Sequence, residues 1–293
     1  MLLRFMDGRN GQNRAKSMMH AIWILQRGLE IVGLVHHAIG NVRHRIKLTD
    51  IFKALKACER NSDRLNNIHL MIITLNTVAM IYLIQSIDWT ALELLELSCC
   101  LIPTYASLLI VLQFCSLCSR FSSRLIKVAD DIRMRGVIDH LKHANLVELA
   151  DDTIRIYGVQ LLINCATTFC TIVSSAYSCY TWGVIEKAPK PPFARIAILL
   201  LFIALRFISI FFLTRASERI RADADRFNLE LFSIMREKKE LCDNDIMSIY
   251  VSVRPSITVT ACKFFVIGHP LLTSINAAAS TYLVILIQFS SSS

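Results

Sequence analysis

The chain has 293 residues, of which 54% are hydrophobic and 19% are charged, and its formal net charge is +9. A soluble domain carries charge on about a quarter of its residues, and the mean hydropathy here is +0.48. The composition therefore excludes a chain organised by one water-soluble core and predicts several membrane-spanning stretches. The first residues show no apolar core of a secretory signal peptide, so we expect the spans themselves to direct insertion.

The N-terminal segment 1–67 contains one ambiguous stretch, 17–37, ahead of a basic cytoplasmic helix. Its apolar stripe at helical spacing comprises Met18, Ile22, Leu25, Leu29 and Val32. Arg27 and Glu30 interrupt the apolar run. One interpretation is an amphipathic helix on the membrane surface. The other is a degenerate span in which Arg27 and Glu30 pair one turn apart.

Five apolar stretches follow that are long enough to cross a bilayer as helices. They are about 68–87, 91–118, 157–182, 194–214 and 270–289. Unbroken apolar runs of this length predict helices, because only helices and closed barrels satisfy the backbone in lipid. We therefore expect an all-α membrane protein with a multi-span helical bundle over 68–214 and a separate C-terminal span of the pore type.

The segments between these spans are long and amphipathic. In 119–156 and in 215–269, apolar residues recur at helical spacing with charges on the other side. We expect both to continue the spans as long cytoplasmic helices, with 215–269 forming anchor helices ahead of the last span. Their apolar faces either pack within one subunit or join several subunits.

Positive charge is distributed unequally between the two ends of the spans. The rich segments, 43–64, 120–155 and 215–263, carry 23 Lys and Arg residues, and the poor ones, 88–90 and 183–193, carry 2. The positive-inside rule places residue 67 inside and the C-terminus outside. This inverted topology is opposite to that of a G-protein-coupled receptor. Because the basic residues flank spans, the net charge predicts no nucleic-acid partner.

The last span has a distinctive face. Its stripe of mostly small or polar residues comprises Ser274, Ala277, Thr281, Ile285 and Gln288. Tyr282 and Phe289 form a neighbouring stripe. A polar side chain is costly against lipid, so this face should meet protein or water. It either packs against another helix or lines a pore.

The same span carries a compact pattern of Thr281-Tyr282, five aliphatic residues and Gln288-Phe289. Upstream of it, in order, come Ala261-Cys262, Phe264-Phe265, Leu271-Leu272, Ser274-Ile275 and Ala277-Ala278. This order resembles the C-terminal signature of insect gustatory receptors, within the insect chemoreceptor superfamily. The resemblance is tight over 258–289 and looser over about 60–257. One departure is Lys263, where the family commonly has Gly.

The resemblance implies a seven-span, ligand-gated, non-selective cation channel, shortened here at the N-terminus by two missing or degraded spans. It implies a homotetramer, or a heteromer with other gustatory receptors, whose last helices line a central pore. The pore and gate positions would be Thr281, Tyr282, Ile285, Gln288 and Phe289. The expected location is the plasma membrane, as a multi-pass protein of chemosensory neuron dendrites. Membrane lipid and a small-molecule tastant are the expected partners.

The resemblance also places a tastant pocket among the outer halves of the spans. The aromatic candidates there are Tyr82, Tyr105, Tyr177, Tyr180 and Trp182. Rings and hydroxyls suit a sugar or an alkaloid. Each of these residues fits an aromatic belt at the membrane interface equally well.

No catalytic site, metal site or cofactor is expected. The sequence has no HExxH, GxSxG, Walker A or GxGxxG motif. Cys115-x-x-Cys118 lacks the second pair that a tetrahedral zinc site needs. Arg206, inside the fourth span, either extends to the headgroups or pairs within the protein.

Three alternatives to a complete channel subunit remain open. One is a truncated, non-conducting subunit that modulates other receptors. Another is a membrane receptor of the G-protein-coupled type, which the inverted topology disfavours. The third is a small transporter subunit, although the sequence shows no inverted repeat of broken helices.

Overall fold

The computed structural model of the chain describes residues 11–55, 63–85, 91–135, 140–180, 193–237, 249–250, 252 and 256–291. Its elements in chain order are α1 (Gly11–Arg43), α2 (Arg45–Leu55), α3 (Asp63–Gln85), α4 (Ala91–Arg135), α5 (His140–Tyr180), α6 (Phe193–Glu237), β1 (Thr260–Ala261), β2 (Phe265–Val266) and α8 (His269–Ser291). Each strand has only two residues. The prediction of an all-α protein is confirmed.

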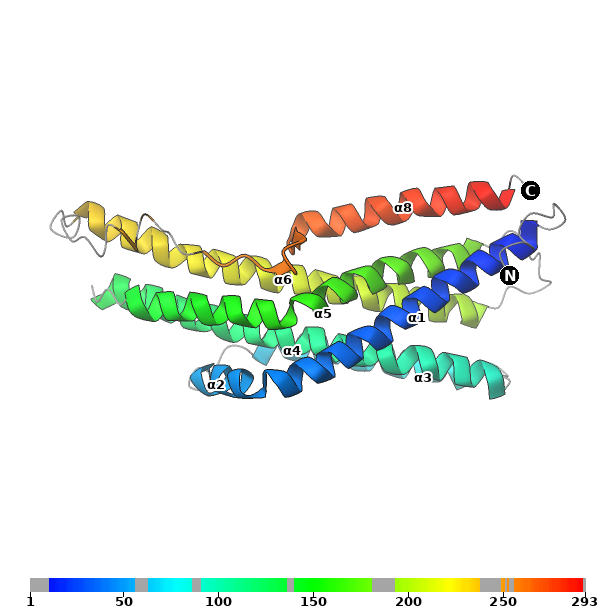
Figure 1. The fold of residues 1–293 in the computed structure, drawn as a ribbon, viewed down its shortest axis with the longest axis horizontal. Helices are drawn as coiled ribbons and strands as arrows, with labels where there is room; N and C mark the ends of the chain where they lie inside the picture. The colour runs from blue at the N-terminus through cyan, green and yellow to red at the C-terminus, as the bar shows by residue number, and fades with distance from the viewer. Residues whose placement is uncertain are drawn as a thin grey trace.

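The long helices run along one axis of an elongated molecule (Figure 1). The helices α4, α5 and α6 contain 45, 41 and 45 residues. At 1.5 Å per residue, a helix of that length extends about 60–70 Å, roughly twice the thickness of the hydrocarbon core of a bilayer. About half of each helix must therefore lie outside the bilayer when the other half is inside it.

Four of the described helices are long and apolar enough to cross a membrane. These stretches are Leu101–Asp131 in α4, Leu141–Tyr180 in α5, Ile196–Glu237 in α6 and His269–Gln288 in α8. They overlap four of the five predicted spans and confirm a multi-span membrane protein. The fifth predicted span, 68–87, falls mostly in α3, which packs against α4 and α6.

Two regions can be distinguished along the three long helices. We call 101–118 of α4, 157–180 of α5 and 196–214 of α6 the span region. We call 119–135, 140–156 and 215–237 of the same helices the extension. Each helix continues from one region into the other without interruption. The helix α8 begins near the junction of the two regions and runs beside the span region (Figure 1).

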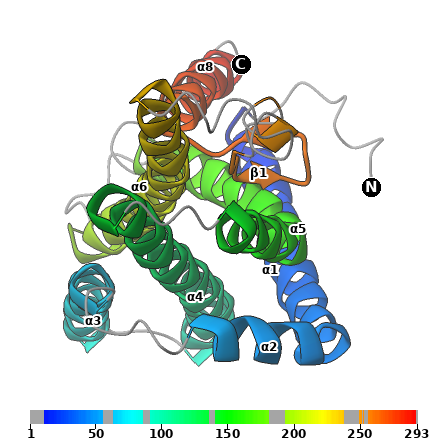
Figure 2. The same cartoon turned by 90° about the vertical axis from the view of Figure 1, so that its left-hand side faces the viewer.

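The bundle has two distinct sides. Viewed from the end of the extension, α8 lies on one side and α2 and α3 lie on the opposite side (Figure 2). The helix α8 packs against α5, α1 and α6, while α4 packs along α6 and α1 packs along α5. The C-terminal helix is therefore a peripheral member of the bundle in a single chain.

The segment 215–269, expected to be helical, contains a hairpin near its end. Here β1 and β2 pair antiparallel, with Thr260 opposite Val266. The turn between them includes Cys262 and Lys263, whose φ angles are 52° and 62°. Two successive positive φ values are incompatible with a right-handed helix, so the chain reverses here. A Gly at the position of Lys263 would suit this backbone because it has no Cβ.

The hairpin is seated on α5 by a close backbone approach. A Cβ added at Gly158 would lie 3.3 Å from the backbone nitrogen of Cys262. Because Gly158 has no side chain, the backbone of the turn can pack directly against α5. Ile257 and Ile267, on either side of the hairpin, are buried in a hydrophobic cluster with residues of α4, α5 and α6.

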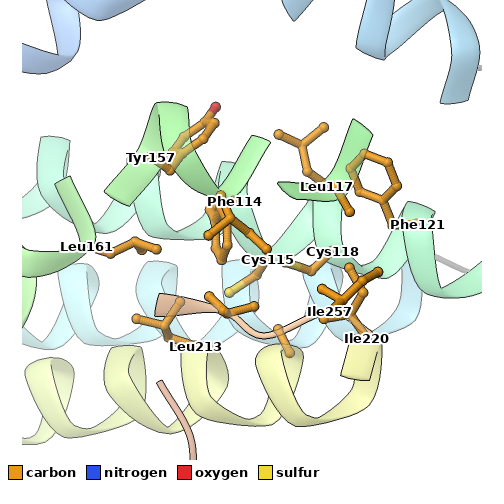
Figure 3. Close-up of a cluster of buried hydrophobic side chains, with 14 of the residues drawn as sticks. Phe114, Cys115, Leu117, Cys118, Phe121, Tyr157, Leu161, Leu213, Ile220 and Ile257 are labelled. Atoms are coloured by element: carbon orange, nitrogen blue, oxygen red, sulfur yellow. The ribbon is translucent and has the colours of Figure 1, made fainter. Parts of the chain in front are cut away.

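The largest hydrophobic cluster lies where the span region meets the extension. Side chains of α4, α5, α6 and the segment before the hairpin gather there, including Phe114, Tyr157, Leu213 and Ile257 (Figure 3). Cys115 and Cys118 are buried within the cluster as free thiols. Among the residues that the structure describes, no three His, Cys, Asp or Glu side chains are grouped to hold a metal ion.

Candidate functional site

The helix α8 begins with a defined anchor on α6. Pro270 occupies its first turn, where the missing N–H of proline costs little. The backbone N–H of His269 donates a hydrogen bond to Glu218 Oε1 at 3.4 Å. A carboxylate at a helix N-terminus is also favoured by the helix dipole. Gly268 leaves room for this contact, since a Cβ there would lie 2.5 Å from the same oxygen.

Little of α8 is covered by the rest of the chain. Only 17% of its apolar window is buried, against 44–56% for the corresponding windows of α4, α5 and α6. The predicted stripe, Ser274, Ala277, Thr281, Ile285 and Gln288, is exposed along its whole length. Thr273, Asn276 and Ser280 are exposed beside it. A single chain thus presents a polar face on its most peripheral apolar helix.

The opposite face of α8 packs on α5. Ala279 and Leu286 are buried against Ile172, Val173 and Tyr177. This buried face fixes the rotation of α8, and the predicted stripe therefore points away from the bundle.

The two aromatic residues of the terminal pattern lie differently. The Tyr282 ring meets Phe169 of α5 edge-on, with ring centroids 5.5 Å apart and an interplanar angle of 82°. Its side chain nevertheless remains 55% exposed. The side chain of Phe289 lies outside the described residues.

The structure brings together only some of the five ligand-pocket candidates. Tyr177 is buried, and its ring centroid is 6.3 Å from that of Tyr180, one turn further along α5. Both pack in the cluster that includes α8. Tyr82 is exposed on α3. Trp182 lies outside the described residues.

Tyr105 belongs to a separate cluster between α3, α4 and α6. Its ring packs with Ile73, Leu108 and Leu205. Its hydroxyl is buried and has no hydrogen-bond partner in the part of the chain that the structure describes. A buried hydroxyl without a partner is costly unless water or a ligand satisfies it.

Two polar residues of α1 are buried in the bundle: Glu30, expected only as a partner of Arg27, and Gln26, which no sequence pattern indicated. Gln26 and Glu30 are each 3% exposed. Gln26 Nε2 donates a hydrogen bond to Thr171 Oγ1 of α5 at 2.8 Å. Glu30 forms an ion pair with Arg206 of α6, and another with Arg27, with 2.5 Å between Glu30 Oε2 and Arg27 Nη1.

The structure describes the contacts of the stretch 17–37 but not whether it crosses the membrane. The Arg27–Glu30 pair forms as the interpretation of a degenerate span required. Leu25 and Val32 of the apolar stripe are exposed by 57% and 59%, so this stripe does not supply the packing face. Arg206 pairs inside the protein rather than extending outward. The signal for these contacts was the pair of charges within an otherwise apolar run.

The extension contains a second polar arrangement, around His143 in the first turn of α5. The imidazole stacks on the Phe227 ring, with centroids 3.9 Å apart, and its Nδ1 contacts the hydroxyl of Tyr250. Burial lowers the pKa of His143 to about 4. The histidine is therefore a neutral core residue at physiological pH.

Residues 140–293 match the 7tm chemosensory receptor family. The match covers α5, α6, the hairpin and α8, which is more than half of the chain. It therefore includes the exposed stripe of α8 and the tyrosine pair of α5. No curated protein matches the chain. The multi-span all-α fold, the terminal pattern in its exposed helix and this match show that the chain belongs to the 7tm chemosensory receptor family.

Proposed function

We propose that the chain is an insect gustatory receptor, a subunit of a ligand-gated, non-selective cation channel that detects tastants. The observation that carries this proposal is the exposed polar stripe of α8. Hydroxyl and amide groups facing lipid would be costly. The face avoids lipid when several copies place it toward a common axis, where it lines a water-filled pore. A homotetramer, or a heteromer with other gustatory receptors, would supply those copies.

The buried face of α8 gives a route from ligand to pore. Tyr177 and Tyr180 lie in the same cluster as Ala279 and Leu286, so a tastant that displaced either ring would act directly on α8. The buried hydroxyl of Tyr105 offers a second polar contact. A ligand with different affinities for the closed and open arrangements would shift the equilibrium between them.

The charge distribution supports an inverted orientation in the plasma membrane. Exposed basic residues of the extension include Lys127, Arg155, Arg215 and Arg221. The positive-inside rule places these in the cytosol and the end of α8 outside. In a sensory neuron, the outer ends of the spans would then meet the tastant.

The test is whole-cell recording during a tastant screen, with adjacent substitutions in α8. Ile285→Cys places a thiol on the exposed stripe, and Leu286→Cys places one on the buried face as the matched control. We expect a thiol reagent to block current through the first variant and spare the second. We also expect Gln288→Ala to change ion selectivity. Block of Leu286→Cys alone would reverse the proposed facing of the helix.

Two other outcomes would select the alternatives. Current that requires a full-length partner, and is altered by this chain without passing through its own α8, would indicate a non-conducting modulatory subunit. A tag after Ser293 that stains only permeabilised cells would overturn the inverted orientation and favour a receptor of the G-protein-coupled type.

A further inference from the structure

We infer that α1 crosses the membrane and is held in the bundle by an ion pair, Glu30 with Arg206, buried at the level of the hydrocarbon core. This role does not depend on channel activity. It concerns a helix that lies outside the matched residues 140–293 and that is not among the four described helices apolar enough to span the membrane by composition alone.

The pair is buried completely and is shared by four helices. Both side chains are 0% exposed. Arg206 also donates hydrogen bonds to Thr104 Oγ1 of α4 at 3.3 Å and to Asn164 Oδ1 of α5 at 3.4 Å. Thr104 in turn donates to Glu30 Oε1 at 3.3 Å. One contact point therefore joins α1, α4, α5 and α6.

The depth of the pair follows from α6. Arg206 lies near the middle of the apolar part of the span region, 196–214. Its partner Glu30 must lie at the same depth. Glu30 is also roughly central in α1, a helix of 33 residues that extends about 50 Å and exceeds the thickness of the hydrocarbon core.

The two faces of α1 are arranged as in a span. Gln26 and Glu30 point into the bundle, whereas the aliphatic side chains Leu25, Val32 and Ile39 are 57–60% exposed. A helix lying on the membrane surface would place its charged face toward water and its apolar face toward lipid. Here the charged face is enclosed by protein, and lipid is the solvent that suits the other face.

A close helix contact supports the same placement. A Cβ added at Gly33 would lie 2.9 Å from Ile163 Cγ2 and 3.3 Å from Gln160 Nε2, both on α5. A Cβ added at Gly28 would meet nothing within 4 Å. Gly33 thus allows α1 to approach α5 within one turn of Glu30, as small residues commonly do between membrane helices.

The ion pair predicts unequal effects of its two partners. Without Glu30, Arg206 is left charged and enclosed, which is strongly destabilising. Without Arg206, Glu30 retains Arg27, whose side chain is 14% exposed and reaches the surface of the bundle. Replacing both residues with apolar ones removes the two fully enclosed charges and leaves Arg27, which is partly exposed.

The first experiment measures the amount of folded receptor that reaches the cell surface, with a tagged full-length chain. We expect E30L to lower it about tenfold or more, R206M to lower it less, and E30L/R206M to recover to within about threefold of the parent. The matched control is Asp130→Leu, which breaks the half-exposed Arg226–Asp130 pair of the extension, 3.0 Å long, and should have little effect. Normal levels for E30L, or a double variant no better than E30L, would overturn the proposal.

The second experiment asks where α1 lies, and it needs no loss of folding. Ser17 and Val42 are exposed near the two ends of the helix, 25 residues apart in the sequence and so about 38 Å apart along it. With an impermeant thiol reagent, S17C and V42C should label from opposite sides of the membrane, relative to the parent chain. Labelling of both from one side would show a surface helix and overturn the inference.

Glycine substitutions provide an independent check on the packing. G33L should displace α1 and reduce folded receptor severalfold, whereas G28L introduces the same side chain into open space and should be tolerated. Equal effects of the two substitutions would contradict the proposed contact with α5.

Discussion

The span region and the extension are built from the same three helices, yet they distribute polarity in opposite ways. In the extension, Leu125, Ala150 and Phe227 are buried, while charged residues such as Lys127 and Arg221 are exposed. In the span region, Asn164 and Arg206 are buried, together with polar residues of α1, and aliphatic residues face outward. Such a difference is expected where water surrounds one region and lipid the other, because exposed charge is favourable in water and exposed hydrocarbon is favourable in lipid.

A single helix shows both arrangements. Along α6, Arg206 and Ser209 are buried while Leu200 is exposed by 55%. Further along the same helix, Leu231 is buried and Glu237 is exposed. Helical propensity therefore does not distinguish the two regions. The change in which face is polar coincides with the boundary between the span region and the extension.

The largest expected effect comes from the core of the extension. Phe227 is 0% exposed and stacks on His143. Phe227→Ala should lower the free energy of unfolding by about 3–5 kcal/mol, because it removes a packed aromatic ring and leaves a cavity. Thermal unfolding of the detergent-solubilised protein measures this. A loss below about 1 kcal/mol would mean that the extension is not a packed core.

The second largest expected effect tests which solvent surrounds each region, by making the same Leu→Lys substitution in α1 and in the extension. Leu25 of α1 and Leu229 of the extension are both exposed, by 57% and 63%. Leu25→Lys should cost about 2.5–3.5 kcal/mol if it faces the membrane centre, whereas Leu229→Lys in water should stay within about 0.5 kcal/mol. Surface expression and stability in lipid nanodiscs measure both variants. Equal effects of the two substitutions would contradict the idea that Leu25 faces lipid and Leu229 faces water.

A smaller effect concerns pH and only the extension. Burial lowers the pKa of His143 to about 4 in the folded state, from 6.5. The folded state thus favours neutral histidine. The contribution of His143 to the free energy of unfolding is therefore fully present above pH 6.5 and is lost progressively as the pH falls toward 4. Between pH 7.5 and pH 5 the loss should be about 2 kcal/mol. Unfolding at several pH values tests this.

His143→Gln is the control for the pH series. It removes the titrating group, so its stability should fall less steeply over the same pH range. A parent and a variant with parallel pH profiles would show that other groups determine the acid sensitivity.

The smallest expected effect is a gain in stability at the hairpin. Lys263 is exposed and has a φ of 62°, a conformation that is strained for a residue with a Cβ. Lys263→Gly should stabilise the protein by about 0.5–1 kcal/mol, the relief of strain being partly offset by a more flexible unfolded chain. Lys263→Ala keeps the Cβ and serves as the control. If both variants gain equally, the lost charge rather than the backbone is responsible.

The long helices could be predicted because each has a strong periodic or apolar signal, and four of the five predicted spans overlap helices apolar enough to cross a membrane. It was also predictable that Thr281, Ile285 and Gln288 share one face, as they do in any α-helix, but not which face of α8 packs on α5. The hairpin was missed because its strands contain two residues each, too few to show alternation. Its turn depends on positive φ values at Cys262 and Lys263, and neither residue type is typical of turns.

The sequence by itself determined the helices, the membrane as their solvent and the family, because apolar length, periodicity and the terminal pattern are local properties of the chain. Only the tertiary structure decided which buried polar groups meet. Glu30 and Arg206 are 176 residues apart in the sequence, and their contact depends on how α1 and α6 pack. An isolated charge in an apolar run shows that a partner is needed. The packing of the helices determines which partner it is.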